Sequence, residues 1–306
     1  MSPIRTLTLS ANSLGIYDRC RRAYYNYKVA GRRAVRPQTG LIAGTALHSA
    51  IECMNLGSPV VKQEQCIDVT LAETPVPPDD YRQAPYLKDA LAAFRAELGT
   101  LFAGWKIEEV ESQGTVPLGA VDYWRDGVKD TAEVSWEFRR DMVGVDRDGR
   151  RWICDYKSGS RNEEAQYSAM KNSGQFLGYV WAWQHQHPDK PVAGVQPVRL
   201  ILRKPTAHGV TYEMPRDNPI FFQPERIEEW HRHTLRKAQE LLSRNPEDPD
   251  DWPLATAELG CCRHTYGCCD YIQTCTLKPE DRAMHLASDL YESSDHAHAN
   301  DTSNAG

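Results

Sequence analysis

The sequence has few of the features that mark a secreted or membrane protein. No apolar run approaches 18 residues, and the N-terminus MSPIRTLTLS lacks the apolar stretch of a signal peptide. We therefore expect a protein of the cytoplasm, where disulfides are rare. The nine cysteines then need another explanation, and the absence of any C-x-x-C pair weakens the usual zinc-ribbon interpretation. No internal repeat is found.

The composition is that of a soluble globular protein, with 41% hydrophobic and 25% charged residues in a chain of 306. The net charge of −6 argues at first against a nucleic-acid partner, but it is unevenly distributed. Residues 245–306 contain twelve acidic and three basic residues, whereas residues 1–40 contain eight basic residues and one acidic residue. The distribution of charge along the chain therefore says more about binding partners than the net charge does.

The basic N-terminal stretch RCRRAYYNYKVAGRR interleaves arginines with tyrosines. Basic groups can bind phosphates while aromatic rings stack on bases, so this stretch is a candidate DNA contact. We name Arg21, Arg22 and Arg33 for this role. An amphipathic helix with a tyrosine face in the core and a solvated basic face explains the pattern equally well.

Hydrophobic periodicity predicts helices and one sheet. Helices are expected from Ser10 or Asn12 through Cys20 and over residues 44–54, 86–105, 170–186 and 224–244. A period of two predicts the sheet over 106–157, and further strands over 197–204 and 209–215. These elements predict a single α/β domain over residues 1–279, in which helices flank a mixed sheet. A helical and loop insertion is expected at about 57–105. The polar tail over 280–306 is expected to be disordered.

Two strand-like runs flank the turn DRDGR, and both contain charged residues, with Asp141 in the first run and Asp155 and Lys157 in the second. If residues 146–150 form the loop of this hairpin, Asp141 lies opposite Asp155, and Lys157 shares their face because residues two apart point the same way. Two opposed carboxylates need a cation between them, and oxygen ligands suit Mg²⁺ or Mn²⁺. A lysine beside the metal can orient or deprotonate a water, which is the chemistry of phosphodiester cleavage. A surface hairpin with balanced charges is the plain alternative.

The order Asp141, Asp155-Tyr156-Lys157 and Gln175-Phe-Leu-Gly-Tyr179 resembles the PD-(D/E)XK nuclease superfamily, in the branch of RecB-type nucleases and CRISPR-associated iron-sulfur exonucleases. The resemblance implies a restriction-endonuclease-like fold. It also implies a metal held by His48 in GTALHSAIE, by Asp141 and Asp155, and by the Tyr156 carbonyl.

The same resemblance makes Lys157 the catalytic lysine, and Gln175 and Tyr179 the Q-x-x-x-Y motif that lies beside the active site and helps to place DNA. Glu133 in AEVSWEF matches an upstream acid of the family more loosely. The segment Phe138-Arg139-Arg140 departs from the family, in which a glycine-containing segment commonly leads into the first aspartate.

Five cysteines cluster in GCCRHTYGCCDYIQTC near the C-terminus. The spacing of Cys262, Cys269 and Cys275 resembles the C-terminal triplet of the iron-sulfur nucleases, whose fourth ligand lies near the N-terminus, where Cys20 fits. The resemblance implies a [4Fe-4S] cluster that ties the two ends of the chain together. Cys261 and Cys268 remain alternatives to their neighbours, and zinc remains an alternative metal. Cys53, Cys66 and Cys154 are interpreted as small buried apolar residues.

Together these features predict a metal-dependent deoxyribonuclease that acts on DNA ends or single strands. The expected setting is recombination, repair or replication, with a phage or mobile-element origin and a helicase or recombination protein as a possible partner. Two alternatives belong to other classes. One is a nucleic-acid-binding subunit that keeps the fold but does not cut, and the other is a zinc-stabilised interaction module.

Overall fold

The computed structural model of this chain describes residues 5–35, 39–160, 164–207, 209, 211–255, 262–264 and 267–293. Its contacts divide the chain into two compact units. Unit 1 comprises Met1–Arg36, Pro117–Ser135 and His233–Gly306, and unit 2 comprises Pro37–Val116 and Trp136–Arg232. The single nuclease domain over 1–279 stays a prediction. No helix in the described part of the chain combines the length and apolar character needed to span a bilayer.

The central sheet is mixed, as predicted. Its strands run in the order β1-β4-β5-β6-β7, and β3 also pairs with β4. The β4–β5 and β6–β7 pairs are antiparallel, whereas β5 and β6 are parallel. The strands are β1 (Arg5–Leu9), β3 (Lys106–Arg125), β4 (Val128–Val145), β5 (Arg151–Gly159), β6 (Gly194–Leu202) and β7 (Tyr212–Glu213).

The hairpin between β4 and β5 has the predicted register. Met142 pairs with Cys154 and Val145 with Arg151, and the Asp146 amide donates to the Arg150 carbonyl over 2.9 Å at the loop. Gly149 takes a left-handed φ of 79°, which explains a glycine at this point of the turn. One further step along this register would bring Asp141 opposite Asp155.

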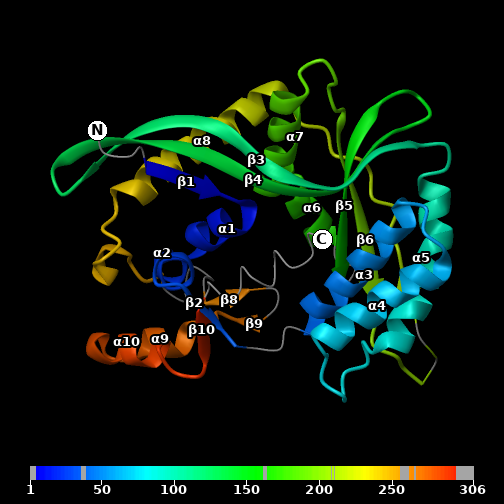
Figure 1. Cartoon of the computed structure of the whole chain (residues 1–306), viewed down its shortest axis with the longest axis horizontal. Coiled ribbons are helices and arrows are strands. Elements are labelled where there is room, and N and C mark those ends of the chain that lie inside the picture. Colours follow the sequence, from blue (N-terminus) through cyan, green and yellow to red (C-terminus); the bar gives the residue numbers. More distant parts are fainter. Residues whose placement is uncertain are drawn as a thin grey trace. The chain divides into compact units, whose positions relative to one another are not determined.

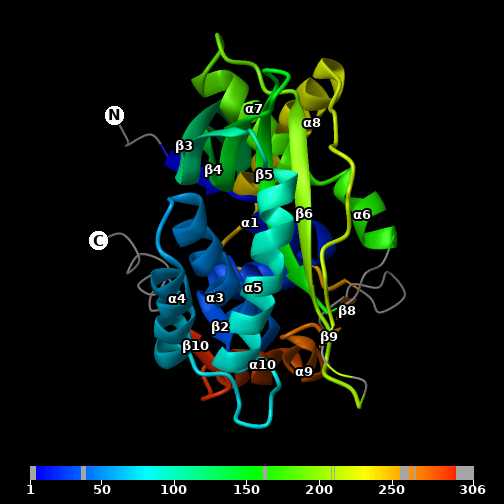
Figure 2. The same ribbon diagram turned by 90° about the vertical axis from the view of Figure 1, so that its right-hand side faces the viewer.

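Helices cover both faces of the sheet in unit 2. Figures 1 and 2 show α3, α4 and α5 on one face of β5 and β6, with α7 on the other. Alternate β5 residues Trp152, Cys154 and Tyr156 join an apolar cluster with residues of α3 and α5. The unit 2 helices are α3 (Thr39–Asn55), α4 (Val60–Glu73), α5 (Ala84–Leu101), α6 (Glu164–Met170) and α7 (Gly174–Gln186).

Helix α4 lies within the helical and loop insertion expected at about 57–105, although the sequence did not predict a helix at its position. Only Gln63 and Ile67 are buried within this helix. Two buried positions are too few to produce the apolar periodicity by which an amphipathic helix is predicted. Helix α3 also begins earlier than expected, at Thr39 rather than residue 44.

Two glycines allow close approach between helices and strands. A Cβ at Gly44 of α3 would lie 2.5 Å from the Oγ of Ser158 on β5. A Cβ at Gly178 of α7 would lie 2.4 Å from Cζ2 of Trp136 on β4. Both distances are shorter than a Cβ atom tolerates, so a larger residue at either position would force the neighbouring side chain or the helix to shift. The two glycines therefore allow the close approach of α3 to β5 and of α7 to β4.

Unit 1 brings the N-terminal helices and the cysteine-rich segment together. Strand β2 (Arg32–Ala34) pairs with β10 (Tyr291–Ser293), and β8 (Arg263–His264) pairs with β9 (Gly267–Cys268) (Figure 1). The helices are α1 (Ala11–Arg19), α2 (Arg21–Tyr24), the π-helix η1 (Tyr25–Val29), the 3₁₀ turn η2 (Pro249–Asp251), α9 (Ile272–Thr276) and α10 (Pro279–Leu286).

Two expectations for unit 1 need correction. Ser10 caps α1 as predicted, but the helix ends at Arg19, because Cys20 is extended with φ −160° and ψ 116°. The tail was expected to be disordered from residue 280, yet 279–286 form α10 and 291–293 form β10, whose residues Leu286 and Tyr291 are buried in a small core. Residues 294–306 lie outside the described part of the chain.

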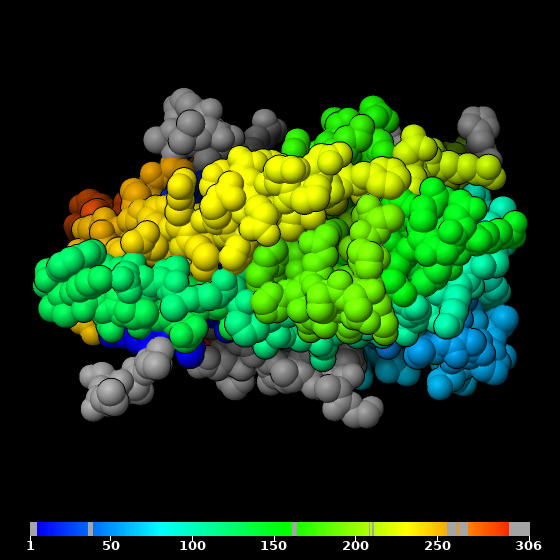
Figure 3. Space-filling view, turned by 90° about the horizontal axis from the view of Figure 1, so that it is seen from above, coloured from blue at the N-terminus to red at the C-terminus, as the bar shows by residue number. Residues whose placement is uncertain are grey.

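Helix α8 (Pro224–Ser243) agrees with the predicted amphipathic helix over 224–244. It presents a row of side chains to solvent, seen in yellow in Figure 3. Its buried residues recur at intervals of three or four residues, as the helical period requires, at Ile227, Trp230, Thr234, Ala238 and Leu241, and the adjacent Leu242 is also buried.

Candidate metal centre

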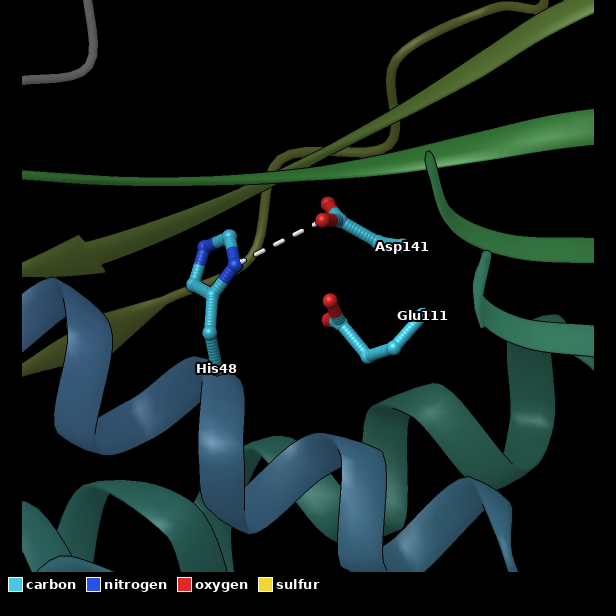
Figure 4. Close-up of side chains that lie close together, drawn as sticks. All are labelled: His48, Glu111 and Asp141. Carbon is cyan, nitrogen blue, oxygen red and sulfur yellow. Dashed lines mark ion pairs between the residues drawn. The ribbon is translucent and has the colours of Figure 1, made fainter. Parts of the chain in front are cut away.

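Three side chains from separate elements of unit 2 converge on one point (Figure 4). His48 comes from α3, Glu111 from β3 and Asp141 from β4, and one ligand atom of each lies within 4.8 Å of the others. The Nδ1 atom of His48 is 3.7 Å from Oδ1 of Asp141. One imidazole nitrogen and two carboxylates form a donor set that suits a divalent cation.

Glu111 is the member of this cluster that the sequence did not indicate. Its backbone has a φ of 49°, which is uncommon for a residue with a side chain of this size and costs on the order of 1 kcal/mol. The side chain accepts a hydrogen bond from Nε of Arg139 over 2.8 Å. Glu133, the loosely matched acid, is instead exposed and belongs to unit 1.

Asp141 is held from two sides. Its Oδ2 accepts a hydrogen bond of 2.6 Å from the Tyr156 amide, and its Oδ1 faces His48. Burial acts to raise the pKa of Asp141, but His48, Lys157 and the Tyr156 amide together outweigh it, so the pKa of this carboxyl is lowered. Burial acts to lower the pKa of His48, and Asp141 outweighs that effect and raises it. The metal-free pair thus favours an imidazolium beside a carboxylate.

Asp155 is buried, with 1% of its side chain exposed, and Lys157 is its cationic partner. The Nζ atom of Lys157 lies 3.0 Å from Oδ1 and 2.7 Å from Oδ2 of Asp155. Burial raises the pKa of Asp155 to about 6, and the charge of Lys157 only partly opposes this. The Lys157 side chain is one-third exposed.

The glutamine and tyrosine of α7 form one hydrogen-bonded pair. Nε2 of Gln175 donates to Oη of Tyr179 over 2.6 Å, one helical turn away. The pKa of Tyr179 is raised by burial and then by the charges of Asp155 and Asp141, which places this hydroxyl in the electric field of the acids. Ser173 caps the helix by accepting from the Phe176 amide.

Tyr156 points to the opposite side of β5 from Asp155, as its position between two charged residues predicts. Its hydroxyl accepts a hydrogen bond of 3.1 Å from Nδ2 of Asn55 on α3. Its ring meets that of His48 edge to face, with centroids 6.2 Å apart. The role of its carbonyl as a metal ligand stays a prediction.

Comparison with known proteins assigns the family. A family model described as the PD-(D/E)XK nuclease superfamily matches residues 8–276. The chain belongs to this superfamily. The search of curated proteins finds no match to this chain.

Two solved structures are similar to this superfamily member. A Eubacterium rectale protein described as "Putative exonuclease" is 13% identical with a TM-score of 0.44, covering 77% of this chain and 80% of its own. The protein SSO0001 is 11% identical with a TM-score of 0.21, covering 67% of this chain and 77% of its own. With TM-scores below 0.5, neither bears on the function of this chain.

The four predicted cluster cysteines gather in unit 1. Cys20 belongs to a small core with Ala23, Tyr271, Leu286 and Tyr291, and Cys269 and Cys275 pack against it. The Cys269 amide donates to the Cys262 carbonyl over 3.0 Å. Burial, followed by the neighbouring Cys20, raises the pKa of Cys275 to about 11. Cys261 and the side chain of Cys268 lie outside the described residues.

The structure corrects one of the three arginines assigned to DNA. The Arg22 side chain is 8% exposed, donates to the Trp252 carbonyl over 2.8 Å and pairs with Asp250 at 3.1 Å. Its donors are therefore used within the protein. Arg21 is one-third exposed and lies 3.7 Å from Glu240, and Arg33 is half-buried on β2 opposite Glu292.

Proposed function

We propose that this protein hydrolyses phosphodiester bonds of DNA with the help of Mg²⁺ or Mn²⁺. The observation that carries the proposal is the convergence of His48, Glu111 and Asp141 in a chain whose family is that of the PD-(D/E)XK nucleases. The neighbouring Asp155–Lys157 pair supplies the further acid and the lysine that such a reaction needs.

The residues fit a divalent ion by charge as well as by donor type. Without metal, each acid of the site has a cationic neighbour: His48 for Asp141, Arg139 for Glu111 and Lys157 for Asp155. His48, Glu111, Asp141 and Asp155 would hold the ion, with the Tyr156 carbonyl as a further oxygen ligand. When bound, the ion would lower the pKa of a water molecule and stabilise charge on the phosphate. Because a ligating imidazole is neutral, binding would release the proton that Asp141 stabilises on His48.

Lys157 acts on the water and the phosphate. Next to the Asp155 carboxylate its amine is held as an ammonium, which orients the attacking water and stabilises charge that develops on the phosphate. Gln175 and Tyr179 place the DNA strand through the amide and hydroxyl groups that they present together. Arg139, which is 62% exposed, can exchange Glu111 for a DNA phosphate once a metal neutralises that carboxylate.

Digestion of end-labelled single- and double-stranded DNA, beside covalently closed circles, tests this function. With Mg²⁺ or Mn²⁺ we expect loss of label from linear DNA and survival of the circles, because the proposed activity acts from ends. Lys157→Met and Asp141→Asn should reduce cleavage by ~10²-fold or more. Asp148→Asn is the matched control, because this acid lies in the same hairpin with a side chain 70% exposed.

The same assay separates the proposal from a subunit that binds without cutting. Tight metal-dependent DNA binding by the wild-type chain with no cleavage of any substrate would favour that second class. Equal cleavage by the wild type and Lys157→Met would remove this lysine from the reaction. Cleavage of closed circles would still support a nuclease but would exclude one that acts only from DNA ends.

We further propose that Cys20, Cys262, Cys269 and Cys275 hold a [4Fe-4S] cluster. The packing of Cys20 with Cys269 and Cys275 in one small core supports it, since a cubane needs four thiolates in one place. Anaerobically purified protein should be brown, with about four irons per chain, and Cys20→Ala should lose them. Cys154→Ser, on β5 in unit 2, is the control that should keep its iron. A content of one zinc and no iron per chain would mean that the four cysteines bind zinc instead of an iron-sulfur cluster.

Partners and setting follow from the resemblance to RecB-type nucleases. We propose that Arg21 and Arg33 contribute phosphate contacts, and that the enzyme acts in the cytoplasm in recombination, repair or replication beside a helicase. Arg33→Gln should flatten the salt dependence of DNA binding by about one phosphate contact. An unchanged slope would leave the basic stretch as a solvated face.

A further inference from the structure

Two cysteines of unit 2 lie side by side, away from the proposed cluster. Cys53 on α3 and Cys66 on α4 have sulfur atoms 2.7 Å apart, and both side chains are half-buried. This corrects their interpretation as buried apolar residues. Cys154, with no exposed surface, does fit that description. Sulfur atoms this close either share a hydrogen or, after oxidation, form a covalent bond of about 2.05 Å.

The packing around the pair holds the two helices at this spacing. The backbone carbonyl of Cys53 accepts a hydrogen bond of 2.9 Å from the Ser58 amide. Nε2 of Gln63 donates a hydrogen bond of 2.7 Å to the Ser58 carbonyl. These bonds brace the short loop between α3 and α4. Ile51 and Ile67, each near one of the cysteines in sequence, are buried in the same apolar cluster. The approach of the sulfurs is therefore a consequence of helix packing and of a braced loop.

We propose that Cys53 and Cys66 form a reversible disulfide by exchange with a low-molecular-weight disulfide such as oxidised glutathione. In the first step, the Cys53 thiolate attacks one glutathione sulfur and the other glutathione leaves as its thiolate. In the second, the Cys66 thiolate attacks the Cys53 sulfur and releases the second glutathione. Two protein thiols are oxidised to one disulfide, and one glutathione disulfide is reduced to two thiols.

The environment decides the order of the two steps. Cys66 packs against the apolar cluster of unit 2, and burial, together with the hydrogen bond to Cys53, raises the pKa of Cys66 to about 12. Cys53 is therefore the first nucleophile, and Cys66 resolves the mixed disulfide. Cytoplasmic disulfides of this kind are usually transient and redox-sensing. The bridge would tie α4 to the helix that carries His48, five residues before Cys53.

Peptide mapping of the intact wild-type chain tests the bridge directly. The protein is equilibrated with reduced and oxidised glutathione, free thiols are alkylated, and the chain is digested with trypsin. Cleavage after Lys62 separates the two cysteines, because residues 34–62 contain only Cys53 and residues 63–82 contain only Cys66. We expect these two peptides to be joined in most chains at an oxidising ratio and released by dithiothreitol. The control peptide, residues 152–157, contains only Cys154 and should carry neither glutathione nor a crosslink.

Single substitutions separate the two roles. Cys66→Ser should accumulate one glutathione on Cys53, because the resolving thiol is gone, while Cys53→Ser should accumulate less on Cys66. Glutathione on Cys53 of the wild type without a 34–62 to 63–82 link would overturn the proposal. A crosslink that forms only when Cys154 also reacts would overturn the proposal too, because the bridge would then form in the unfolded chain rather than in the folded protein. The readout is independent of nuclease activity and of the cluster.

Discussion

The buried carboxylate of Asp155 should destabilise the metal-free protein at neutral pH, and Asp155→Asn should relieve this. Burial raises its pKa from an ordinary value of 3.8 to about 6. For an acid with a raised folded-state pKa, the stabilising contribution is complete below pH 3.8 and is lost as the pH rises through 6. At 1.36 kcal/mol for each pH unit, the full penalty above pH 6 is about 3 kcal/mol.

The difference between the wild type and Asp155→Asn cancels the titrations of groups that do not interact with Asp155. Between pH 4.5 and pH 7.5 the free energy of unfolding of the wild type should fall relative to the variant by about 2 kcal/mol, because 1.5 pH units of the penalty lie in that window. The Asn side chain has nearly the same shape and keeps a hydrogen-bond acceptor for Lys157.

Urea unfolding in EDTA at pH 4.5, 6 and 7.5 measures both proteins, with Asp148→Asn as the matched control on the same hairpin. Parallel profiles for the wild type and Asp155→Asn would refute the reasoning, since they would mean that ionising Asp155 costs nothing in the fold. Added Mg²⁺ should stabilise the wild type at pH 7.5 more than it stabilises Asp155→Asn, because a bound cation removes the penalty only where a charge exists.

Further predictions concern metal binding and packing. Glu111→Gln should weaken Mn²⁺ binding, measured by calorimetry, by ~10-fold or more, whereas the exposed Glu133→Gln should leave it unchanged; equal affinities would exclude Glu111 as a ligand. Gly178→Ala should lower the free energy of unfolding by about 1–3 kcal/mol, because its methyl group would overlap the Trp136 ring, and unchanged denaturation would contradict the close approach of α7. Arg22→Gln should reduce stability and leave the salt dependence of DNA binding intact, since its guanidinium is used inside unit 1.

The sequence was most informative where one strong local signal determined the geometry. The period of two and the turn DRDGR fixed the β4–β5 register, and the four-residue spacing of Gln175 and Tyr179 fixed their contact on α7. Those features depend on residues near one another in the chain. The family assignment rested on the same motifs, and the family match over residues 8–276 confirmed it.

Features that depend on distant packing or on a single unusual backbone angle were not predictable. KIEEVESQG contains three glutamates within four positions, and only the left-handed φ of Glu111 selects the one that meets His48 and Asp141. Similarly, RCRR gives no sign that Arg22 is buried, because its partners lie about 230 residues away at Asp250 and Trp252. The Cys53–Cys66 contact depends on α4, which has too few buried residues to be recognised as a helix from its sequence.

The departure from the family pattern at Arg139 and Arg140 acquires a physical reason from these contacts. Arg140 is buried, stacks against Phe138 and Trp183 and hydrogen-bonds Ser112 on β3, so it helps to fix β3 against β4 close to Glu111. Arg139, on the other side of the strand, neutralises the Glu111 carboxylate itself. A glycine-containing segment would provide neither contact. The two arginines thus offset, by packing and by charge, the cost of holding a glutamate in a left-handed conformation beside a second buried acid.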